Sequence, residues 1–412
     1  MKNGWTGGQY SLFRILFGAY LCLHFLALAP WGEELFSNRG ALPDASASPL
    51  VGLFPNLFAF ADSPAVVLLA ILLAAAASLA FAAGWKDRAA ALGIWWVWAC
   101  LFGRNPLISN PSLPFVGWIL LAHLFLPRAP FGSVAARGRP DPGGGWRMPP
   151  GVFAAAWIVL SVAYTYSGAT KLASPSWRAG TALVKTLDNP LARPGPLRDL
   201  LLSLPEELLQ AATWIVLGLE ILFAPLALFR AIRPWLWLAL LGMHASLVAV
   251  LDFADLSLGM GMIHLFTFDP AWIRPRRSAA PATLFYDGAC GLCHRFVRFV
   301  LAEDRQGLFR FAPLGGATFS DAIPADRRAG LPDSLVVRTA EGGVFVRSAA
   351  TLHVLGCLGG AWRLLGGVAR LVPGPIRDRL YDGIARARSR LFRRPPAACP
   401  VGTPETRARF SE

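Results

Sequence analysis

The sequence predicts an α-helical polytopic membrane domain followed by a small α/β domain. Two observations carry this prediction: the composition is apolar, and every long apolar run lies before residue 270. Of the 412 residues, 55% are hydrophobic and only 16% are charged, which is too apolar for an ordinary soluble chain. We therefore place a transmembrane domain at residues 1–275 and a smaller soluble domain at residues 276–412.

The apolar runs predict about eight spans of the bilayer. A run of about 20 residues is long enough to cross a hydrocarbon core of roughly 30 Å. The first run ends in "LALAP", which is similar to a signal-peptide cleavage site, but the runs that follow favour a retained helix. The predicted spans are residues 10–30, 61–85, 89–103, 111–127, 151–170, 206–229, 235–252 and 254–270.

Basic residues between the runs predict the orientation of the chain. The net charge of +14 comes largely from arginines in short loops and in the C-terminal tail, which is typical of membrane topology and does not indicate nucleic-acid binding. The positive-inside rule assigns the basic loops to the cytoplasm. An even number of spans then places both termini and the soluble domain in the cytoplasm, as in a multi-pass plasma-membrane protein. The tail "RARSRLFRR" at 386–394 fits an anionic lipid surface or a solvated helix end equally well.

The soluble domain shows the alternation of short strands and amphipathic helices expected of an α/β fold. The first strand passes through a glycine turn into a helix that opens with C-x-x-C, which is the thioredoxin-like arrangement. We expect strands at 282–286, 308–312, 334–339 and 343–348, and helices at 290–303, 349–371 and 376–393.

The segment "YDGACGLCHRF" at 286–296 holds the cysteine pair, and its C-x-x-C-H pattern has four interpretations. A c-type haem needs a second axial ligand, yet every methionine lies before residue 281. A zinc site needs four ligands, and the domain adds only His353, Cys357 and Cys399 in no knuckle spacing. We therefore predict no metal and favour a redox dithiol, while a purely structural pair of buried cysteines stays open.

The position of the pair at a helix start predicts a role for each thiol. Cys290 and Cys293 lie on one helix face, because residues three apart are stacked. A cysteine in the first turn meets unsatisfied N–H groups and the positive end of the helix dipole, and both stabilise a thiolate. We expect Cys290 to be the more exposed, attacking thiol and Cys293 the resolving thiol. The partner would be a thiol protein or a small thiol.

The same region resembles a known family. The stretches "LFYDGACGLCHRFVRFVLAEDRQGLFRFAPL" and "SAATLHVLGCLGGAWRLLGGVARLVPGPIRDRLYDGIARARSRLFRR" look like the DCC family of thiol-disulfide oxidoreductases, over most of 281–412. The resemblance implies that Asp287, Cys290 and Cys293 form the site.

Ionisable residues inside the predicted spans mark candidate contacts for a cofactor. Such residues are costly in a bilayer and usually face a cavity or a partner. For each histidine, a single hydrogen bond between helices explains the residue equally well. The candidates are His24, His123, Glu220, His244 and His264.

Two membrane segments carry a second resemblance. "YTYSGATKLASPSWRAGTAL" at 164–183 and "YSLFRILFGAYLCLHF" at 10–25 are similar to the HTTM domain, which is related to vitamin K-dependent γ-carboxylase, over about residues 10–270. This resemblance implies that Lys171 is a general base acting on a reduced membrane quinone. A lysine that snorkels to the interface from a helix end is an equally good interpretation.

Together these features predict a membrane-anchored thiol-disulfide oxidoreductase, with the dithiol coupled to a membrane quinone. An alternative is a quinone- or lipid-modifying enzyme centred on Lys171, with a regulatory thiol domain. A third is a transporter or assembly scaffold in which the ionisable residues only hold helices together.

Overall fold

The chain folds into two units. The computed structural model describes residues 2–143, 145–276, 280–392 and 403–411. The helical unit consists of Phe13–Leu126 and Pro149–Phe268. The second, which we call the sheet unit, consists of Lys2–Leu12, Pro127–Met148 and the chain from Asp269 onward. The sheet unit is therefore assembled from three separate stretches of sequence.

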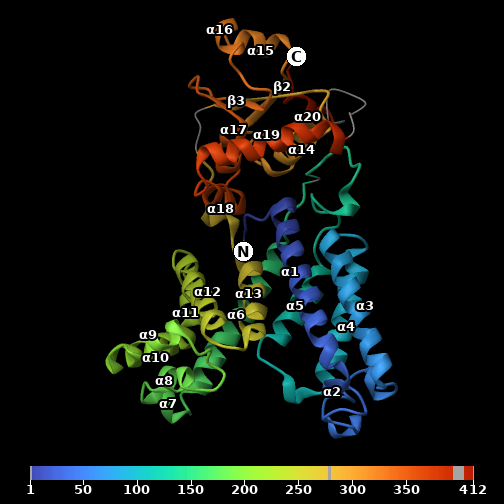
Figure 1. Cartoon of the computed structure of the whole chain (residues 1–412), viewed down its shortest axis with the longest axis vertical. Helices are drawn as coiled ribbons and strands as arrows, with labels where there is room; N and C mark the ends of the chain where they lie inside the picture. Colours follow the sequence, from blue (N-terminus) through green and yellow to red (C-terminus); the bar gives the residue numbers. More distant parts are fainter. Residues whose placement is uncertain (1, 144, 277–279, 393–402, 412) are drawn as a thin grey trace. The chain divides into compact units, whose positions relative to one another are not determined.

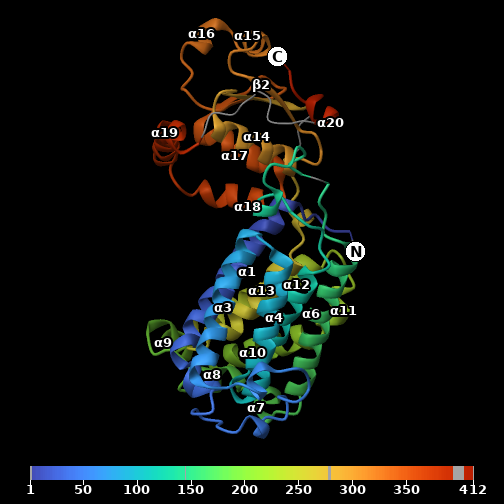
Figure 2. The same ribbon diagram turned by 90° about the vertical axis from the view of Figure 1, so that its right-hand side faces the viewer.

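Most of the helical unit is a series of neighbouring helices (Figures 1 and 2). The pairs α3 and α4, α4 and α5, α5 and α13, α13 and α12, and α6 and α10 pack against each other. The helices are α1 (Gly7–Leu28, which begins in the sheet unit), α2 (Gly32–Phe36), α3 (Pro64–Ala83), α4 (Asp87–Arg104), α5 (Leu113–His123), α6 (Pro150–Lys171), α7 (Pro175–Arg178), α8 (Ala182–Leu187), α9 (Pro196–Leu202), α10 (Glu206–Ile221), α11 (Phe223–Ala227), α12 (Arg233–Val250) and α13 (Ala254–Thr267).

The expected count of eight spans is wrong. Among the described residues, four helices are long and apolar enough to cross a membrane: Gly7–Phe36, α3, α6 and α12. A fifth is obtained only if α9 and α10, bent by 100° at their junction, count as one span. The other expected spans do not qualify, for two physical reasons. α5 and α13 are too short, with 11 and 14 residues or about 16 and 21 Å of helix. α4 is long enough but carries three charged residues, Asp87, Arg88 and Arg104. The argument from an even count thus loses its basis, and the orientation stays a prediction.

A four-stranded mixed sheet forms the centre of the sheet unit. Its strands are β1 (Ala282–Tyr286), β2 (Phe309–Pro313), β3 (Val336–Arg338) and β4 (Val344–Val346), in the order β2-β1-β3-β4. β1 and β2 are parallel, with Leu284 opposite Phe311, whereas β3 is antiparallel to β1 and to β4. Parallel neighbours require a crossover, which α14 (Gly291–Glu303) supplies. The result is a β1-α14-β2 unit followed by a hairpin.

Helices cover both faces of this sheet (Figure 1). On one face Leu284, Phe311 and Val337 join the apolar side of α14 and of α17 (Arg347–Leu358). On the other, Phe285 and Val336 pack against Phe319 of α15 (Ala317–Ala322) and its neighbours, next to α16 (Ala325–Arg328). Successive strand residues point to opposite faces, so both sets come from the same strands. Each large side chain so buried contributes roughly 1.5–3 kcal/mol.

The helices of the sheet unit differ from the expected ones. Two short helices, α15 and α16, precede β3 where none was predicted. The helix expected at 349–371 is two helices, α17 and α18 (Gly360–Ala369), because Gly359 and Gly360 have φ of +73° and +55°. A side chain at Gly360 would also collide with Gln9, since an added Cβ would lie 2.3 Å from its Oε1 atom. α19 (Gly374–Leu391) and the short α20 (Pro404–Arg407) follow.

The carboxylate of Glu303 links the N-terminal segment to the rest of the sheet unit. Glu303 is the last residue of α14 and is 3% exposed. It accepts hydrogen bonds from the Thr6 hydroxyl, from the backbone N–H of Gly8 at 2.8 Å and from the indole of Trp362. Burial raises the pKa of this carboxyl, although the three donors act in the opposite direction. The negative charge also sits at the N-terminal end of α1, where the helix dipole favours it.

Replacing Glu303 with alanine should loosen this junction selectively. The change leaves three buried donors without an acceptor, which costs about 2 kcal/mol. Amide hydrogen exchange in α14 and α18, measured by mass spectrometry on the full chain, should accelerate about thirtyfold if local opening governs it. Asp326→Ala, at an exposed site on α16, is the matched control and should change little. Equal exchange in the two variants would contradict a structural role for Glu303.

Candidate functional site

The cysteine pair stands where β1 passes into α14. Asp287 holds the turn that joins β1 to α14. Its carboxylate accepts the N–H of Ala289 at 2.8 Å, and its carbonyl accepts the N–H of Cys290 at 3.1 Å. Cys290 has extended backbone angles and caps the helix, and its sulfur accepts the backbone N–H of Cys293 at 3.3 Å. Sulfur is a weak acceptor when neutral, so a thiolate at this position would strengthen the cap.

Both thiols are buried. Cys290 is 7% exposed and Cys293 is 9% exposed, so the expectation that Cys290 would be the more exposed is wrong. They belong to the core cluster on the α14 face of the sheet, together with Val297 and Leu335. α19 packs against α14 as well, and sequence patterns gave no indication of this contact. A partner must therefore reach a thiol that is nearly enclosed.

The surroundings distinguish the two thiols. Burial, with a hydrogen bond and charge interaction from Cys290, raises the pKa of Cys293 to about 12. Cys293 is then a protonated thiol near neutral pH and can donate to the sulfur of Cys290. The start of α14 favours negative charge on the Cys290 sulfur. The roles of attacking and resolving thiol stay predictions.

Arg388 brings a positive charge to the site from α19. Its guanidinium lies 2.8 and 2.9 Å from the two carboxylate oxygens of Asp333 and 3.6 Å from the carboxylate of Asp287. Burial lowers the pKa of Arg388, but its bond to Asp333 and its interactions with Cys290 and Cys293 together raise it above the usual value. Sequence reasoning missed this residue, which it treated only as part of a basic tail. No local signal could have found it, because α19 lies far along the chain from the cysteines.

His294 supports the turn that carries the dithiol. Its Nε2 atom lies 3.0 Å from the carbonyl oxygen of Gly288 and donates to it. Its ring meets that of Tyr286 edge-on at 5.8 Å. Arg295, the next residue, places its guanidinium 4.8 Å from the ring of Phe392.

A third thiol, Cys357, lies in the same core cluster. Its sulfur is 3.5 Å from Nε2 of His353, and burial raises the pKa of Cys357 to about 11. Within the described parts of the chain, no group of three or more His, Cys, Asp or Glu side chains is arranged to hold a metal ion. Cys399, considered as a zinc ligand from the sequence, lies outside the described residues.

Lys171, Glu220, His244 and His264 lie near one another in the helical unit, in two hydrogen-bonded sets whose charges interact. Lys171 on α6 pairs with the carboxylate of Glu220 on α10 and donates to the Ser167 hydroxyl at 3.0 Å. The hydroxyl of Tyr164 bridges the other two, at 2.8 Å from Nε2 of His244 and 2.6 Å from Nε2 of His264.

His24 and His123 lie in other places within the helical unit. Nδ1 of His24 is 2.7 Å from the carboxylate of Asp255, beside a large cavity. Nε2 of His123 is 3.5 Å from the carboxylate of Asp87. The residues predicted to contact a cofactor therefore do not line one common site.

Comparison with known proteins concerns the C-terminal part of the chain. A family described as DCC1-like thiol-disulfide oxidoreductases matches residues 284–394. An uncharacterized protein, YuxK, of Bacillus subtilis (strain 168) is 34% identical over 131 residues, which is 31% of this chain and 91% of the relative. A chloroplastic DCC family protein of Arabidopsis thaliana is 28% identical over 111 residues, 27% of this chain and 64% of the relative. No solved structure gives a significant match.

The raised pKa of Cys293 makes its alkylation strongly dependent on pH. In a Cys290→Ser variant the burial that is the main cause of the raised pKa remains, only the thiolate form of Cys293 reacts with the reagent, and below its pKa the thiolate fraction grows about tenfold per pH unit. The iodoacetamide rate, followed on the peptide by mass spectrometry, should keep rising between about pH 8 and about pH 10. An unstructured peptide with one internal cysteine, whose thiol has the ordinary pKa of about 8.5, levels off over this range. A plateau for Cys293 at the same pH would contradict the effect of burial.

Proposed function

Because the chain belongs to the DCC1-like thiol-disulfide oxidoreductase family through residues 284–394, we propose that it is a membrane-anchored thiol-disulfide oxidoreductase. Its dithiol is Cys290 and Cys293. The observation that carries the proposal is the hydrogen bond from the N–H of Cys293 to the sulfur of Cys290 at the first turn of α14. This contact offers stabilisation to a thiolate at the position that attacks first.

The exchange follows from the two thiols. The Cys290 thiolate attacks one sulfur of a partner disulfide, which forms a mixed disulfide and releases one partner thiolate. Cys293 then loses its proton and attacks the Cys290 sulfur, which releases the second partner thiolate. Two electrons pass from the dithiol to the partner, and both released thiolates take up protons. With an oxidised site and a reduced partner, the same steps run in reverse.

The topology supports a thioredoxin-like domain. β1, α14 and β2 form a parallel β-α-β unit, and the C-x-x-C opens its crossover helix. This placement puts the cysteines at the carboxyl end of β1, where ligands of open α/β sheets bind. The partner is a thiol protein or a small thiol that can reach this edge.

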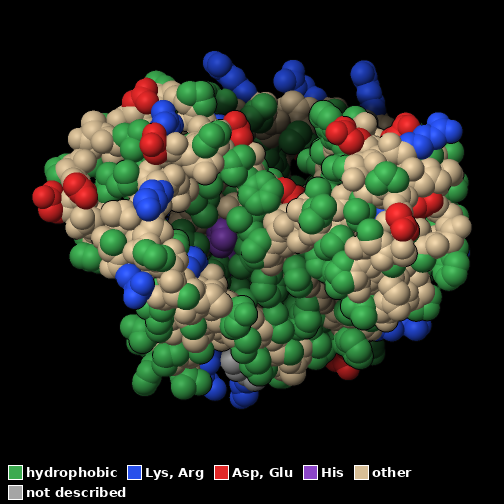
Figure 3. All heavy atoms as spheres, turned by 90° about the horizontal axis from the view of Figure 1, so that it is seen from below, with side chains coloured by type: hydrophobic (Ala, Val, Ile, Leu, Met, Phe, Trp, Pro, Cys, Tyr) green, Lys and Arg blue, Asp and Glu red, His purple; other side chains and the backbone are tan. Residues whose placement is uncertain are grey.

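Two features support anchoring at a membrane. The helical unit has four helices able to span it, and Figure 3 shows hydrophobic side chains spread over much of one face. Among the described residues of the sheet unit, the large hydrophobic side chains that are exposed lie on α18, on α19 and in the turn between them. They are Leu364, Leu365, Val368, Leu371, Val372, Ile376, Leu380 and Ile384.

Basic residues accompany this apolar surface. Arg363 and Arg370 are exposed on and beside α18, and Arg379 and Arg386 are exposed on α19. A hollow of about 600 Å³ lies between α18 and the segment that contains Arg274, lined by Arg363, Val368 and Leu371 among others. Apolar side chains interspersed with arginines fit the interface of an anionic bilayer. Of the basic tail predicted from the sequence, Arg386 and Arg390 are exposed on α19, Arg388 lies beside Asp287 instead, and the last two arginines lie outside the described residues.

Two other hypotheses have less support than thiol exchange. They are coupling to a membrane quinone through Lys171 and the HTTM-type enzyme that the sequence resemblance implies. The Nζ atom of Lys171 is held by Glu220 and Ser167 and lies 4.8 Å from the ring of Trp177. These contacts use the amine as a hydrogen-bond donor to two groups of the protein, and Lys171 does not line the large cavity of the helical unit. The transporter or scaffold alternative leaves the arrangement of the two thiols unexplained.

Thiol exchange is tested by replacing each cysteine with serine. Wild-type full-length protein should reduce a mixed-disulfide peptide once its own dithiol is reduced. Cys290→Ser should abolish this activity, and Cys293→Ser should trap the peptide as a stable mixed disulfide on Cys290, visible as a mass increase. Cys357→Ser is the matched control and should retain activity, because its thiol is not part of the pair. Unchanged activity in Cys290→Ser would refute the proposal.

Lipid contact by the sheet unit is tested with a fluorophore on α18. Bimane attached to Val368→Cys, in a Cys290→Ser/Cys293→Ser background, should be strongly quenched by nitroxide lipids in nanodiscs, because this side chain is 65% exposed on the apolar surface. Bimane at Asp326→Cys on α16 is the control and should be quenched weakly. Quenching at Val368→Cys should increase when the nanodiscs contain phosphatidylglycerol. Equal quenching at the two positions would show that α18 does not meet lipid.

A further inference from the structure

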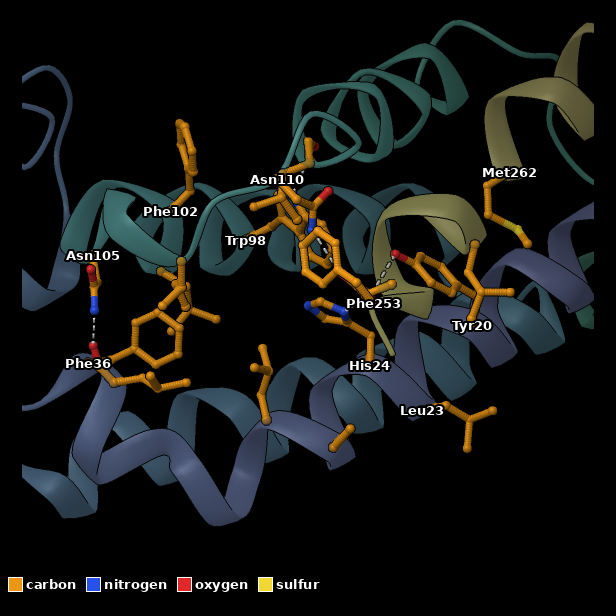
Figure 4. A pocket seen from close by; sticks show the side chains of 18 of the residues that line it. Tyr20, Leu23, His24, Phe36, Trp98, Phe102, Asn105, Asn110, Phe253 and Met262 are labelled. Carbon is orange, nitrogen blue, oxygen red and sulfur yellow. Dashed lines mark hydrogen bonds and ion pairs between the residues drawn. The ribbon is translucent and has the colours of Figure 1, made fainter. Parts of the chain in front are cut away.

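The helical unit contains a large cavity that the dithiol chemistry does not use. Its volume is about 680 Å³, within the range of small-molecule sites. α1, α2, α4 and α13 contribute most of its lining (Figure 4). The walls are mainly apolar and include Leu16, Leu23, Phe36, Phe102 and Met262. Lys171 is not among the lining residues.

A cluster of polar groups stands at one place in this apolar wall. The carboxylate of Asp255, in the first turn of α13, accepts three hydrogen bonds, two from α1 and one from the segment between α4 and α5. The donors are the Tyr20 hydroxyl at 3.1 Å, Nδ1 of His24 at 2.7 Å and the Asn110 amide at 3.0 Å. A carboxylate so placed is satisfied by the protein itself, and the start of α13 favours its charge. It therefore fixes the ring of His24 and leaves no need for a ligand cation.

The second ring nitrogen of His24, Nε2, is the atom from which we infer a ligand. Because an ionised carboxylate only accepts, Nδ1 donates its proton to Asp255, and in this tautomer Nε2 offers its lone pair as an acceptor. Among the described residues, Nε2 makes no hydrogen bond. Figure 4 shows the ring pointing into the cavity beside Phe253 and Tyr20. Its centroid lies 4.6 Å from that of Trp98.

We propose that this cavity binds a lipid-soluble molecule ending in a hydroxylated aromatic ring, whose hydroxyl donates a hydrogen bond to Nε2 of His24. The apolar walls accommodate a hydrocarbon tail, and Trp98 and Phe253 offer aromatic faces to the ring. An acyl chain alone would fill the same space but would leave Nε2 without a donor. The aromatic hydroxyl supplies that donor, and this is the reason for choosing it.

The pairing with Asp255 gives the site a further property. A histidine whose Nδ1–H is held by a carboxylate is oriented to take a proton at Nε2, because the carboxylate stabilises the imidazolium that forms. The bound hydroxyl group would therefore be polarised toward its anion. This inference is independent of the proposed thiol exchange, since it involves neither cysteine of the pair.

Three probes of similar length test the contribution of the hydroxyl group and that of the aromatic ring separately. They are para-heptylphenol, heptylbenzene, which lacks the hydroxyl, and decanol, which lacks the ring. Binding to the full-length protein in detergent is measured by isothermal titration, with Ala19→Phe as the reference for partition into micelles, because the added ring protrudes into the cavity and obstructs it. The phenol should bind about tenfold more tightly than either of the other probes, as one hydrogen bond plus ring contacts would provide.

His24→Leu tests the assigned nitrogen. This variant should lose about tenfold in affinity for para-heptylphenol and keep its affinity for heptylbenzene, since only the hydrogen bond is removed. His123→Leu, which alters a buried histidine outside the cavity, is the matched control and should bind the phenol as the wild type does. Equal binding of phenol and heptylbenzene by the wild type would overturn the proposal without any variant. Equal binding of phenol and decanol would overturn the choice of an aromatic ring.

Discussion

The buried carboxylate of Glu303 is the contact on which the sheet unit depends. It joins three stretches that are far apart in the sequence, because its donors are Thr6 and Gly8 at the start of the chain and Trp362 in α18. A carboxylate taken out of water is costly unless each oxygen is hydrogen-bonded, so the arrangement is stable only when all three stretches are in place. α14 is consequently fixed at both ends, by this carboxylate at one and by the turn of Asp287 at the other.

The state of the dithiol reflects two opposing effects. Burial disfavours any thiolate, and it holds Cys293 as a thiol. The start of α14 and the nearby Arg388 favour negative charge, and they act at the place where Cys290 caps the helix. The two effects therefore act differently on two cysteines that are only three residues apart.

Sequence patterns described the strands and α14 well because those elements depend on local alternation and on the C-x-x-C turn. They did not describe the break at Gly359 and Gly360, since an apolar run continues through both residues and only the backbone angles reveal the stop. Eight apolar runs were expected to be spans, yet run length does not show where a helix ends, and α5 and α13 end early.

Contacts between distant segments could not be predicted either, because local sequence patterns do not show which segments meet. Neither the approach of Arg388 to the cysteines nor the bond between His24 and Asp255 has a signature within either segment. His24 was found as an ionisable residue in an apolar run, but its partner and its cavity required the fold.

The junction at Glu303 has a consequence for the biosynthesis of the protein. Thr6 and Glu303 are separated by 297 positions, so Thr6 is synthesised long before the carboxylate to which it donates. At a synthesis rate of about 5–20 residues per second, the delay is roughly 15–60 s. During that time α1 and the helices after it are complete, while the Thr6 hydroxyl and the Gly8 N–H lack this acceptor. The junction at Glu303 thus forms late, and the segment around Thr6 must stay accessible until then.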